Sequence, residues 1–302
     1  MNNKKVTILL STYNGEKYVE EQLDSIFKQT YKDIDILVRD DGSTDRTTEI
    51  LEKYEKHGKI NVEYGVNLGF TKSFYRLLEN VPESDYYSFA DQDDVWLEEK
   101  IEKAVGALEN TKQDIAALYF CDFDFYDDRM NFIAHKKEHK TKLTLPNALV
   151  NNVGCGFTFV INNELRRLFL LMPPEKNFSH DYLAMLIGVT LGEAIYDKGR
   201  YAKYRRHEKN VSSFSRNFLK NQLLRLKFVL VSSNNQYRKN WKDFYEIYES
   251  LLDSKIKDEL KLFSNARCRL DHAVRKAFYP KRYRDTLVDE IAMRFFFIIG
   301  RL

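Results

Sequence analysis

The stretch YYSFADQDDVW, at residues 86–96, joins an apolar, aromatic run to a cluster of carboxylates. Asp91, Asp93 and Asp94 follow the run directly, where a buried strand would end. In open α/β sheets, ligands bind at the C-terminal ends of the strands. Clustered carboxylates repel each other unless a positive charge lies among them. Two interpretations are therefore open from this stretch alone: a divalent cation that holds a phosphate-bearing substrate, or a solvated acidic turn that caps the next helix.

The same succession of strand and polar turn occurs twice upstream. VTILL at residues 6–10 is a β-rich run that ends in STYNG at 11–15, and IDILV at 34–38 ends in RDDGSTD at 39–45. Segments with the apolar spacing of amphipathic helices separate the runs. Strand–helix alternation at this spacing predicts βαβ units and therefore an α/β fold with a mostly parallel sheet.

The polar turns of these units should lie together. Parallel strands share a direction, so the turns after the first, second and fourth strands fall on one edge of the sheet. We therefore expect residues 12–13, 40–41 and 91–93 to converge. No glycine-rich phosphate loop follows the first strand, so a phosphate at this edge would be held by a metal.

Charge divides the 302-residue chain into two parts. Residues 1–214 hold 29 Lys+Arg against 35 Asp+Glu, whereas residues 215–302 hold 19 against 10 and carry a net charge of +9. The second part has a helical pattern in which aromatic and basic residues are interleaved. Three roles remain open for this basic region: contact with anionic lipid, packing on the first part as a plain helical bundle, or formation of a homodimer.

The cysteines and apolar runs favour a cytoplasmic protein. Cys121, Cys155 and Cys268 show no metal-like or redox-pair spacing, and an odd, sparse count fits a reducing compartment. The N-terminus lacks the apolar region of a signal peptide. The apolar run at residues 295–299 is far shorter than the roughly 20 residues that span a bilayer. We therefore expect no transmembrane helix, with at most peripheral contact at the inner face of the cell membrane.

Two local features after residue 121 need separate interpretations. His135 and His139 are flanked by lysines, so we expect a solvated loop rather than a metal pair. Gly154 and Cys155 precede a strand predicted at 157–161, where glycine allows close approach of the backbone to a ligand or a bulge. We place both residues at a donor or acceptor pocket, with Cys155 as a small packed residue rather than a nucleophile.

The combined motifs resemble the inverting family 2 glycosyltransferases, which have the GT-A fold. The matching stretches appear in the family's order across residues 5–211: STYNG at 11–15, RDDGSTD at 39–45, NLG at 67–69, ADQDDVW at 90–96, His180-Asp181, and YRRH at 204–207 with Asn210. The motif DQDDVW most resembles the corresponding motif of bacterial polysaccharide transferases, rhamnosyltransferases among them. The resemblance implies a GT-A, Rossmann-like catalytic domain over residues 1–214, flanked by helices and followed by a helical C-terminal extension over 215–302.

The resemblance also implies a nucleotide site. Its residues would be Thr12, Tyr13, Asp40, Asp41, Lys72, Asp91 and Gln92. Tyr13 would lie against the base, Asp40 would accept a hydrogen bond from a pyrimidine, and Asp91 would face the ribose. Asp41 would support the loop, and Lys72 would be a further nucleotide contact.

Metal and base positions follow from the same resemblance. Asp93, in the family's DXD motif, would bind Mn²⁺ or Mg²⁺ that bridges the diphosphate, and His207 would be a further ligand. Asp181 matches the general base; His180 stands before it, where the family usually has an acidic residue. From residue type alone, Asp181 also suits a helix N-cap, and His207 also suits a surface turn.

The expected function is metal-dependent, inverting transfer of a sugar from a UDP- or dTDP-sugar, with dTDP-rhamnose as a candidate donor. The acceptor would be a glycan or a lipid-linked sugar in cell-surface polysaccharide synthesis, such as that of a capsule. A metal-dependent nucleotidyltransferase is an alternative, but it normally needs a phosphate loop rich in glycine and lysine, which is not found here. A second alternative function is nucleic-acid binding by the basic region. The acidic charge of residues 1–214 disfavours this alternative, and we expect no nucleic-acid partner.

Overall fold

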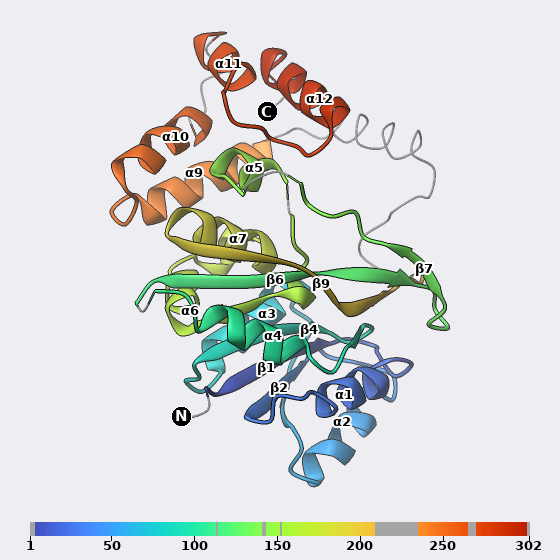
Figure 1. The fold of residues 1–302 in the computed structure, drawn as a ribbon. Helices are drawn as coiled ribbons and strands as arrows, with labels where there is room; N and C mark the ends of the chain where they lie inside the picture. Colours follow the sequence, from blue (N-terminus) through green and yellow to red (C-terminus); the bar gives the residue numbers. More distant parts are fainter. Residues whose placement is uncertain are drawn as a thin grey trace. The chain divides into compact units, whose positions relative to one another are not determined.

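The computed structural model describes residues 4–112, 114–140, 143–151, 153–208, 235–264 and 270–300. The chain divides into two compact units (Figure 1). Unit 1 comprises residues 1–138 and 152–206, and unit 2 comprises residues 139–151 and 207–302. The domain boundary predicted at residues 214 and 215 lies outside the described residues and stays a prediction.

Four parallel strands form the first half of the sheet in unit 1, in the order β3-β2-β1-β4. They are β1 (Val6–Thr12), β2 (Ile34–Asp40), β3 (Asn61–Tyr64) and β4 (Tyr86–Asp91). The helices that connect them are α1 (Val19–Phe27), α2 (Thr47–Lys56) and α3 (Phe70–Asn80). β1 and β4 are buried along nearly their whole length, because strands covered on both faces need continuous apolar runs. The predicted βαβ units and mostly parallel sheet are confirmed.

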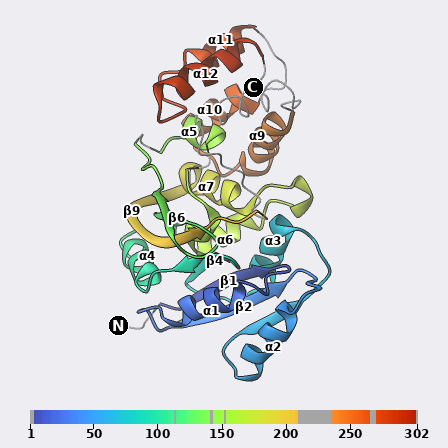
Figure 2. The ribbon, with the colours of Figure 1, turned by 90° about the vertical axis from the view of Figure 1, so that its right-hand side faces the viewer.

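The strand order explains why helices cover both faces of the sheet. The connections from β1 through α1 to β2, and from β2 through α2 to β3, move outward in one direction. The connection through α3 returns across the sheet to β4. Right-handed crossovers therefore put α3 on the opposite face from α1 and α2, and Figure 2 shows helices on both sides of these strands.

The second half of unit 1 completes a mixed sheet of nine strands. Its elements are β5 (Val95–Trp96), α4 (Lys100–Leu108), β6 (Ala116–Tyr126), β7 (Phe132–His135), β8 (Val160–Asn162), α6 (Asn163–Phe169), α7 (His180–Thr190) and β9 (Gly192–Arg205). β8 is antiparallel to both β4 and β6, whereas β9 is parallel to β6. Short 3₁₀ turns occupy Gly156–Thr158 and Pro174–Lys176.

Two sequence predictions in this half were wrong, and a strand predicted at 193–196 was too short. Residues 122–144 are not a charged loop throughout, because β6 continues to Tyr126 and pairs with β7. The short strand predicted at 193–196 is the start of the 14-residue β9. The strand predicted at 157–161 is a 3₁₀ turn followed by β8. In each case, pairing with a distant strand decided the outcome, and local sequence carries little of that information.

Unit 2 is helical. Its helices are α5 (Leu145–Val150), α9 (Asn235–Tyr248), α10 (Ser254–Ser264), α11 (Leu270–Ala277) and α12 (Leu287–Ile298). Trp241, Phe263 and Phe297 lie in its core, and the Trp241 Nε1–H donates to the Leu149 carbonyl across 3.2 Å. The predicted helical C-terminal region is confirmed for the described residues; the part predicted between 218 and 230, and Cys268, lie outside them.

His139 corrects another expectation, because it does not lie in a solvated loop. Its side chain is buried in unit 2, and Nδ1 lies 2.7 Å from Asp285 Oδ2. His135 does lie at an exposed position, 2.8 Å from Asp124 Oδ1. Among the described helices of both units, none is long and apolar enough to span a membrane.

Candidate active site

The carboxyl ends of β1, β2 and β4 bring the predicted polar turns to one edge of the sheet. In the strand register, Thr12 lies opposite Asp40 and Ser11 lies opposite Asp91. Thr12 Oγ1 donates to Asp40 Oδ1 across 2.9 Å. The predicted convergence of the three turns is therefore confirmed, and it follows directly from parallel pairing.

Asp40 is held in one orientation by three donors. In addition to Thr12, the Ser43 hydroxyl donates to Oδ1 (2.6 Å), and the Ser43 backbone N–H donates to Oδ2 (2.8 Å). The side chain is almost fully buried at the end of β2. These bonds compensate for the burial of a carboxylate, which would otherwise be costly, and they aim Asp40 at the edge where a ligand would lie.

Tyr13 and Gln92 connect the first and fourth turns. The Gln92 amide accepts from the Tyr13 backbone N–H (2.8 Å) and donates to the Tyr13 carbonyl (3.0 Å). A Cβ at Gly15 would lie 2.1 Å from Gln92 Oε1, so only glycine leaves room for this amide. The Tyr13 ring is 46% exposed. Gln92 therefore fixes the backbone that presents an accessible aromatic ring.

Asp41 supports the loop that follows β3. Its carboxylate pairs with the buried Arg39 guanidinium and accepts from the backbone N–H groups of Leu68 (2.9 Å) and Gly69 (2.8 Å). Arg39 in turn donates to the Val66 carbonyl (3.1 Å). Asp41 is therefore tied to the protein itself. Its carboxylate spans the loop at residues 67–69 rather than pointing outward from the edge.

Lys72 is exposed in the first turn of α3. It lines a small hollow together with Phe178 and Leu183. Its ammonium group has no hydrogen bond or ion pair within the described part of the chain. Lys72 is thus available for an anionic ligand.

Three carboxylates crowd together at the end of β4. The pKa of Asp91 is raised to about 7, first by burial and then by the negative charges of Asp93 and Asp181. Asp91 is the last residue of β4 and Asp93 is in the β4–β5 turn, whereas Asp181 is the second residue of α7, after its N-cap Ser179. The N-cap interpretation of Asp181 is therefore wrong. The structure brings this predicted base to the acidic turn across about ninety residues of chain.

Arg205 clamps the acidic turn from β9. Its backbone N–H donates to Asp94 Oδ1 (3.1 Å), and its Nε donates to the Asp93 carbonyl (2.9 Å). The same guanidinium donates to the Asp128 carbonyl (3.0 Å) and pairs with Glu21. Asp94 is fully buried, and burial together with Asp93 and Asp91 raises its pKa well above the ordinary value. Asp94 therefore holds the turn in place rather than facing a ligand.

Lys100 lies buried beneath the same turn. Its Nζ donates to Ser88 Oγ (3.1 Å) and lies 3.6 Å from the centre of the Trp96 ring. Burial lowers its pKa to about 8. A cation over an indole face is a favourable contact, so Lys100 fixes Trp96 and the start of α4.

The segment 154–156 packs closely against aromatic side chains. A Cβ at Gly154 would lie 2.3 Å from the Phe159 ring, and one at Gly156 would lie 2.0 Å from His180 Nε2. His180 is buried against Phe74, with 4.1 Å between the ring centres, and neither ring nitrogen has a hydrogen-bond partner in the described chain. Burial lowers the pKa of His180. Packing alone thus explains both glycines.

Cys155 is half-buried and close to the carboxylate cluster. Burial raises its pKa to about 12, and the charges of Asp181, Asp91 and Asp94 add to the rise. A thiol with a raised pKa is a poor nucleophile. The expectation of a small packed residue fits this environment, and a role in a donor or acceptor pocket stays a prediction.

The carboxylates at the end of β4 were tested for their fit to a divalent cation. No group of three His, Cys, Asp or Glu side chains with metal-binding geometry occurs among the residues that the structure describes. His207 belongs to unit 2, and its role as a ligand stays a prediction. Mg²⁺ is usually bound through one or two carboxylates plus substrate phosphates and water, and Mn²⁺ also prefers oxygen ligands. The crowded carboxylates at Asp91 and Asp93 therefore fit a divalent cation that arrives with a diphosphate.

Sequence reasoning missed the roles of Arg39, Ser43 and Arg205. Each lies within one of the motifs given above, but the sequence of a motif does not show which of its side chains are buried. One signal was available: Arg39 and Arg205 are charged residues within strands, and a buried charge requires a partner. Asp41 is the partner of Arg39 and Glu21 is the partner of Arg205, 2 and 184 residues away in the chain.

Comparison with known proteins identifies the family of this chain. The model of the family described as "Glycosyl transferase family 2" matches residues 7–163. The dTDP-rhamnosyl transferase RfbG of Shigella flexneri is 32% identical over 214 residues, which cover 67% of this chain and 72% of that protein. The uncharacterized glycosyltransferase RT0329 of Rickettsia typhi is 27% identical over 219 residues, 71% of this chain and 68% of that protein.

Solved structures show the same fold. TarS 1-349 of S. aureus in complex with UDP has a TM-score of 0.56 at 19% identity, over 95% of both chains. The mannosyltransferase PcManGT of Pyrobaculum calidifontis, in complex with GDP-Man and Mn²⁺, has a TM-score of 0.53 at 14% identity, over 100% of this chain and 86% of that chain. The chain thus belongs to glycosyl transferase family 2 and is a nucleotide-sugar glycosyltransferase with the GT-A fold.

Proposed function

We propose that the protein transfers a deoxyhexose, with dTDP-rhamnose as the first donor to test, by a metal-dependent, inverting reaction. The observation that carries the proposal is the meeting of Asp91, Asp93 and Asp181 at the carboxyl edge of the sheet. The RfbG relative is named a dTDP-rhamnosyl transferase, which supports the choice of donor. The proposed acceptor is a glycan or a lipid-linked sugar in cell-surface polysaccharide synthesis.

The donor nucleotide would lie along the edge formed by β1 and β2. Tyr13 offers an exposed ring for the base, on a backbone that Gln92 holds. Asp40, fixed by Thr12 and Ser43, would accept a hydrogen bond from a pyrimidine. Asp91 would face the ribose, and Lys72 would contact the phosphates. In this proposal Asp41 and Gln92 act through the loops that they support.

Asp93 would bind Mn²⁺ or Mg²⁺ together with the diphosphate, and His207 would add a ligand. When bound, the cation neutralises the negative charge of the leaving diphosphate. The binding of GDP-Man and Mn²⁺ by the structural relative PcManGT supports this choice of cofactor. The β5–β9 pairing next to the turn and the bond from Arg205 to the Asp93 carbonyl hold the backbone of Asp93 in place.

Asp181 would act as the general base. An acceptor hydroxyl is a weak nucleophile, and a carboxylate within hydrogen-bond reach takes its proton during attack. The acceptor oxygen bonds to the anomeric carbon, the bond from that carbon to the phosphate oxygen breaks, and the proton goes to Asp181. One displacement inverts the anomeric centre.

A donor screen with two variants tests the proposal. Release of nucleoside diphosphate is measured with dTDP-rhamnose, UDP-GlcNAc and GDP-Man, with and without Mn²⁺. We expect Asp93→Ala to lose metal-dependent donor binding. We expect Asp181→Asn to keep binding and to lose transfer by about 10²–10⁴-fold. Glu52→Gln, an exposed acid on α2, is the matched control and should leave both unchanged.

Three outcomes would overturn parts of the proposal. Normal transfer by Asp181→Asn would reassign the base. Donor binding that is independent of metal in the unmodified protein would remove the role given to Asp93. Release from UDP-GlcNAc or GDP-Man but not from dTDP-rhamnose would change the donor and leave the reaction class intact.

A further inference from the structure

Helix α12 exposes a row of large apolar side chains. Val288, Ile291, Phe295 and Ile298 recur every three or four residues, so they share one face of the helix. Each is between 48% and 60% exposed. The opposite face buries Met293, Phe296 and Phe297 in the core of unit 2. The helix is therefore apolar on both sides, and only one side is used for packing.

Helix α11 continues the same surface. It packs beside α12 (Figure 1), and Val274 and Phe278, four residues apart, are 44% and 76% exposed. We call the exposed side chains of the two helices the apolar face: Val274, Phe278, Leu287, Val288, Ile291, Phe295 and Ile298. Contiguous exposed apolar surface of this kind marks a site of interaction with a protein or a membrane.

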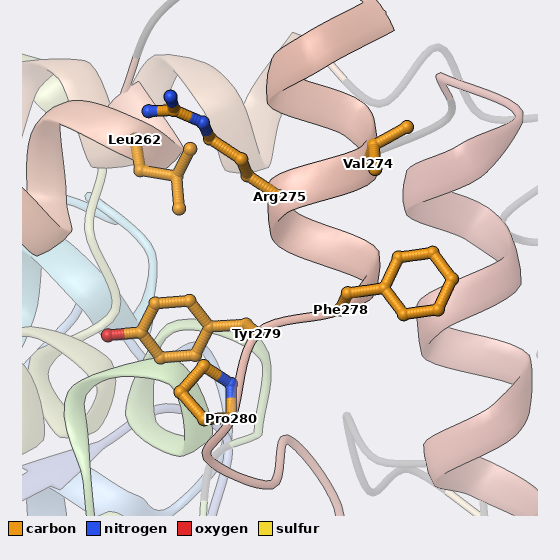
Figure 3. Close-up of a pocket in the computed structure, with 6 residues that line it drawn as sticks. All are labelled: Leu262, Val274, Arg275, Phe278, Tyr279 and Pro280. Atoms are coloured by element: carbon orange, nitrogen blue, oxygen red, sulfur yellow. The ribbon is translucent and has the colours of Figure 1, made fainter.

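A cavity of about 450 Å³ lies at the edge of α11 (Figure 3). Its lining is apolar except for one cation: Leu262, Val274, Arg275, Phe278, Tyr279 and Pro280. Figure 3 shows the Arg275 side chain reaching toward Leu262, while Phe278 points away from Tyr279. Arg275 makes no ion pair or hydrogen bond among the residues that the structure describes. The cavity thus combines apolar walls with an available guanidinium group.

Two partners could cover the apolar face, a second copy of the chain or a lipid surface, and charge favours one of them. Residues 215–302 carry a net charge of +9. The described residues of this region, 235–264 and 270–300, hold 12 Lys+Arg against 10 Asp+Glu, and the remaining excess of positive charge lies outside them. The net charge of the region has the same sign in a second copy and would oppose the pairing of two copies. An anionic lipid surface offers the opposite charge to the cations and an acyl boundary to the apolar side chains.

We propose that the apolar face of α11 and α12 docks on the surface of an anionic phospholipid bilayer. Phe278, Ile291 and Phe295 enter the boundary between headgroups and acyl chains. Arg275 contacts lipid phosphates at the rim of the cavity. With 12 residues, α12 is too short to cross the bilayer, so it lies in the plane of the interface, as amphipathic helices do. This inference is independent of the donor and the acceptor.

Flotation of the full chain with lipid vesicles tests the inference. The probes are phosphatidylcholine vesicles with and without phosphatidylserine. The unmodified chain should float with the anionic vesicles and much less with the neutral ones, and added salt should weaken binding. The double variant Ile291→Gln with Phe295→Gln should lower the partition coefficient at least about tenfold, since each side chain loses apolar burial. Arg275→Gln should lower it about fivefold.

Phe132→Gln is the matched control, because Phe132 is a similarly exposed aromatic residue of unit 1, 52% exposed. It should float like the unmodified chain. Thermal unfolding followed by circular dichroism confirms that each variant is folded. The inference is overturned if the double variant floats normally, if the unmodified chain does not float, or if anionic and neutral vesicles bind it equally. It is also overturned if light scattering shows a dimer that the double variant loses.

Discussion

At the carboxyl edge of the sheet in unit 1, arginine, lysine and aspartate side chains are buried, whereas on α12 of unit 2, isoleucine and phenylalanine side chains are exposed. Both arrangements cost free energy when considered alone. At the sheet edge, hydrogen bonds and ion pairs within the chain compensate for the buried charge. Arg39 pairs with Asp41, and Arg205 pairs with Glu21 and donates to the Asp93 and Asp128 carbonyls. On α12, nothing in the described chain covers the apolar side chains.

This difference shows how each region is completed. The sheet edge is organised before any ligand arrives, because its charged groups already have partners and fixed orientations. The apolar face gains its compensation only on contact with something outside the chain. Substitutions at the sheet edge should therefore change the stability of the isolated protein, whereas those on the apolar face should not.

The largest effect is expected for Arg205→Met. It removes the guanidinium that contacts the Asp93 and Asp128 carbonyls and leaves the buried turn without its cation. We expect the free energy of unfolding to fall by about 3–5 kcal/mol, because two hydrogen bonds from a charged donor are lost, each worth about 1.5–3 kcal/mol. Urea denaturation measures the change. Arg200 lies on the same strand and has a more exposed side chain, so Arg200→Met should lower the free energy of unfolding by at most about 1 kcal/mol. Equal losses for the two variants would contradict the role of Arg205 in holding the turn.

Gly156→Ala should have the next largest effect. The added Cβ would lie 2.0 Å from His180 Nε2, so the imidazole has to shift among its aromatic neighbours. Overpacking of this kind costs about 1–3 kcal/mol. Adding His180→Ala should recover part of the loss, which a double-mutant cycle would detect. Gly106→Ala in α4, where no atom lies within 4 Å of the new Cβ, should be neutral or stabilising. If the losses in free energy of unfolding for Gly156→Ala and His180→Ala are strictly additive, the added methyl group and the imidazole do not compete for the same space.

Gln92→Ala should have a smaller effect, on donor binding more than on folding. The substitution removes both hydrogen bonds from the Gln92 side chain to the Tyr13 backbone. Neutral hydrogen bonds contribute about 1 kcal/mol each. We expect the donor KM to rise about five- to thirtyfold, with little change in kcat. If Gln92 acts through Tyr13, adding Tyr13→Ala should weaken donor binding less than the sum of the single changes. Full additivity would instead favour a direct contact between Gln92 and the nucleotide.

The smallest effect is expected for Ile291→Ser. Its side chain is 60% exposed, so the free energy of unfolding should change by less than about 0.5 kcal/mol. Met293→Ala, two residues along the same helix and buried, should cost about 2–5 kcal/mol. Thermal or urea unfolding compares the two. A large loss for Ile291→Ser would mean that the apolar face already packs against the protein, and the contrast between the two regions would then fail.

Local sequence patterns predicted much of unit 1. The apolar runs at 6–10, 34–38 and 85–90 are β1, β2 and β4, and the polar turns after them meet at one edge, as parallel pairing requires. The predictions were poorer beyond residue 121, where β6 continues to Tyr126 and pairs with β9 in a register that shifts near Cys121 and Asp122. In that part of the chain, pairing with other strands defines the strands, and the alternation of apolar and polar residues along each strand does not.

Residue types and spacing by themselves determined the class of fold, the acidic site at the sheet edge and the helical, basic C-terminal region. The tertiary structure alone decided which side chains hold the site together: Arg205 reaches the Asp93 carbonyl across 112 residues, Gln92 holds Tyr13, and Asp181 joins the carboxylates from α7. It also decided which face of α12 is exposed, since both faces are apolar. The physical reason is that periodicity follows from the local backbone geometry, whereas contacts between distant segments depend on how the whole chain packs.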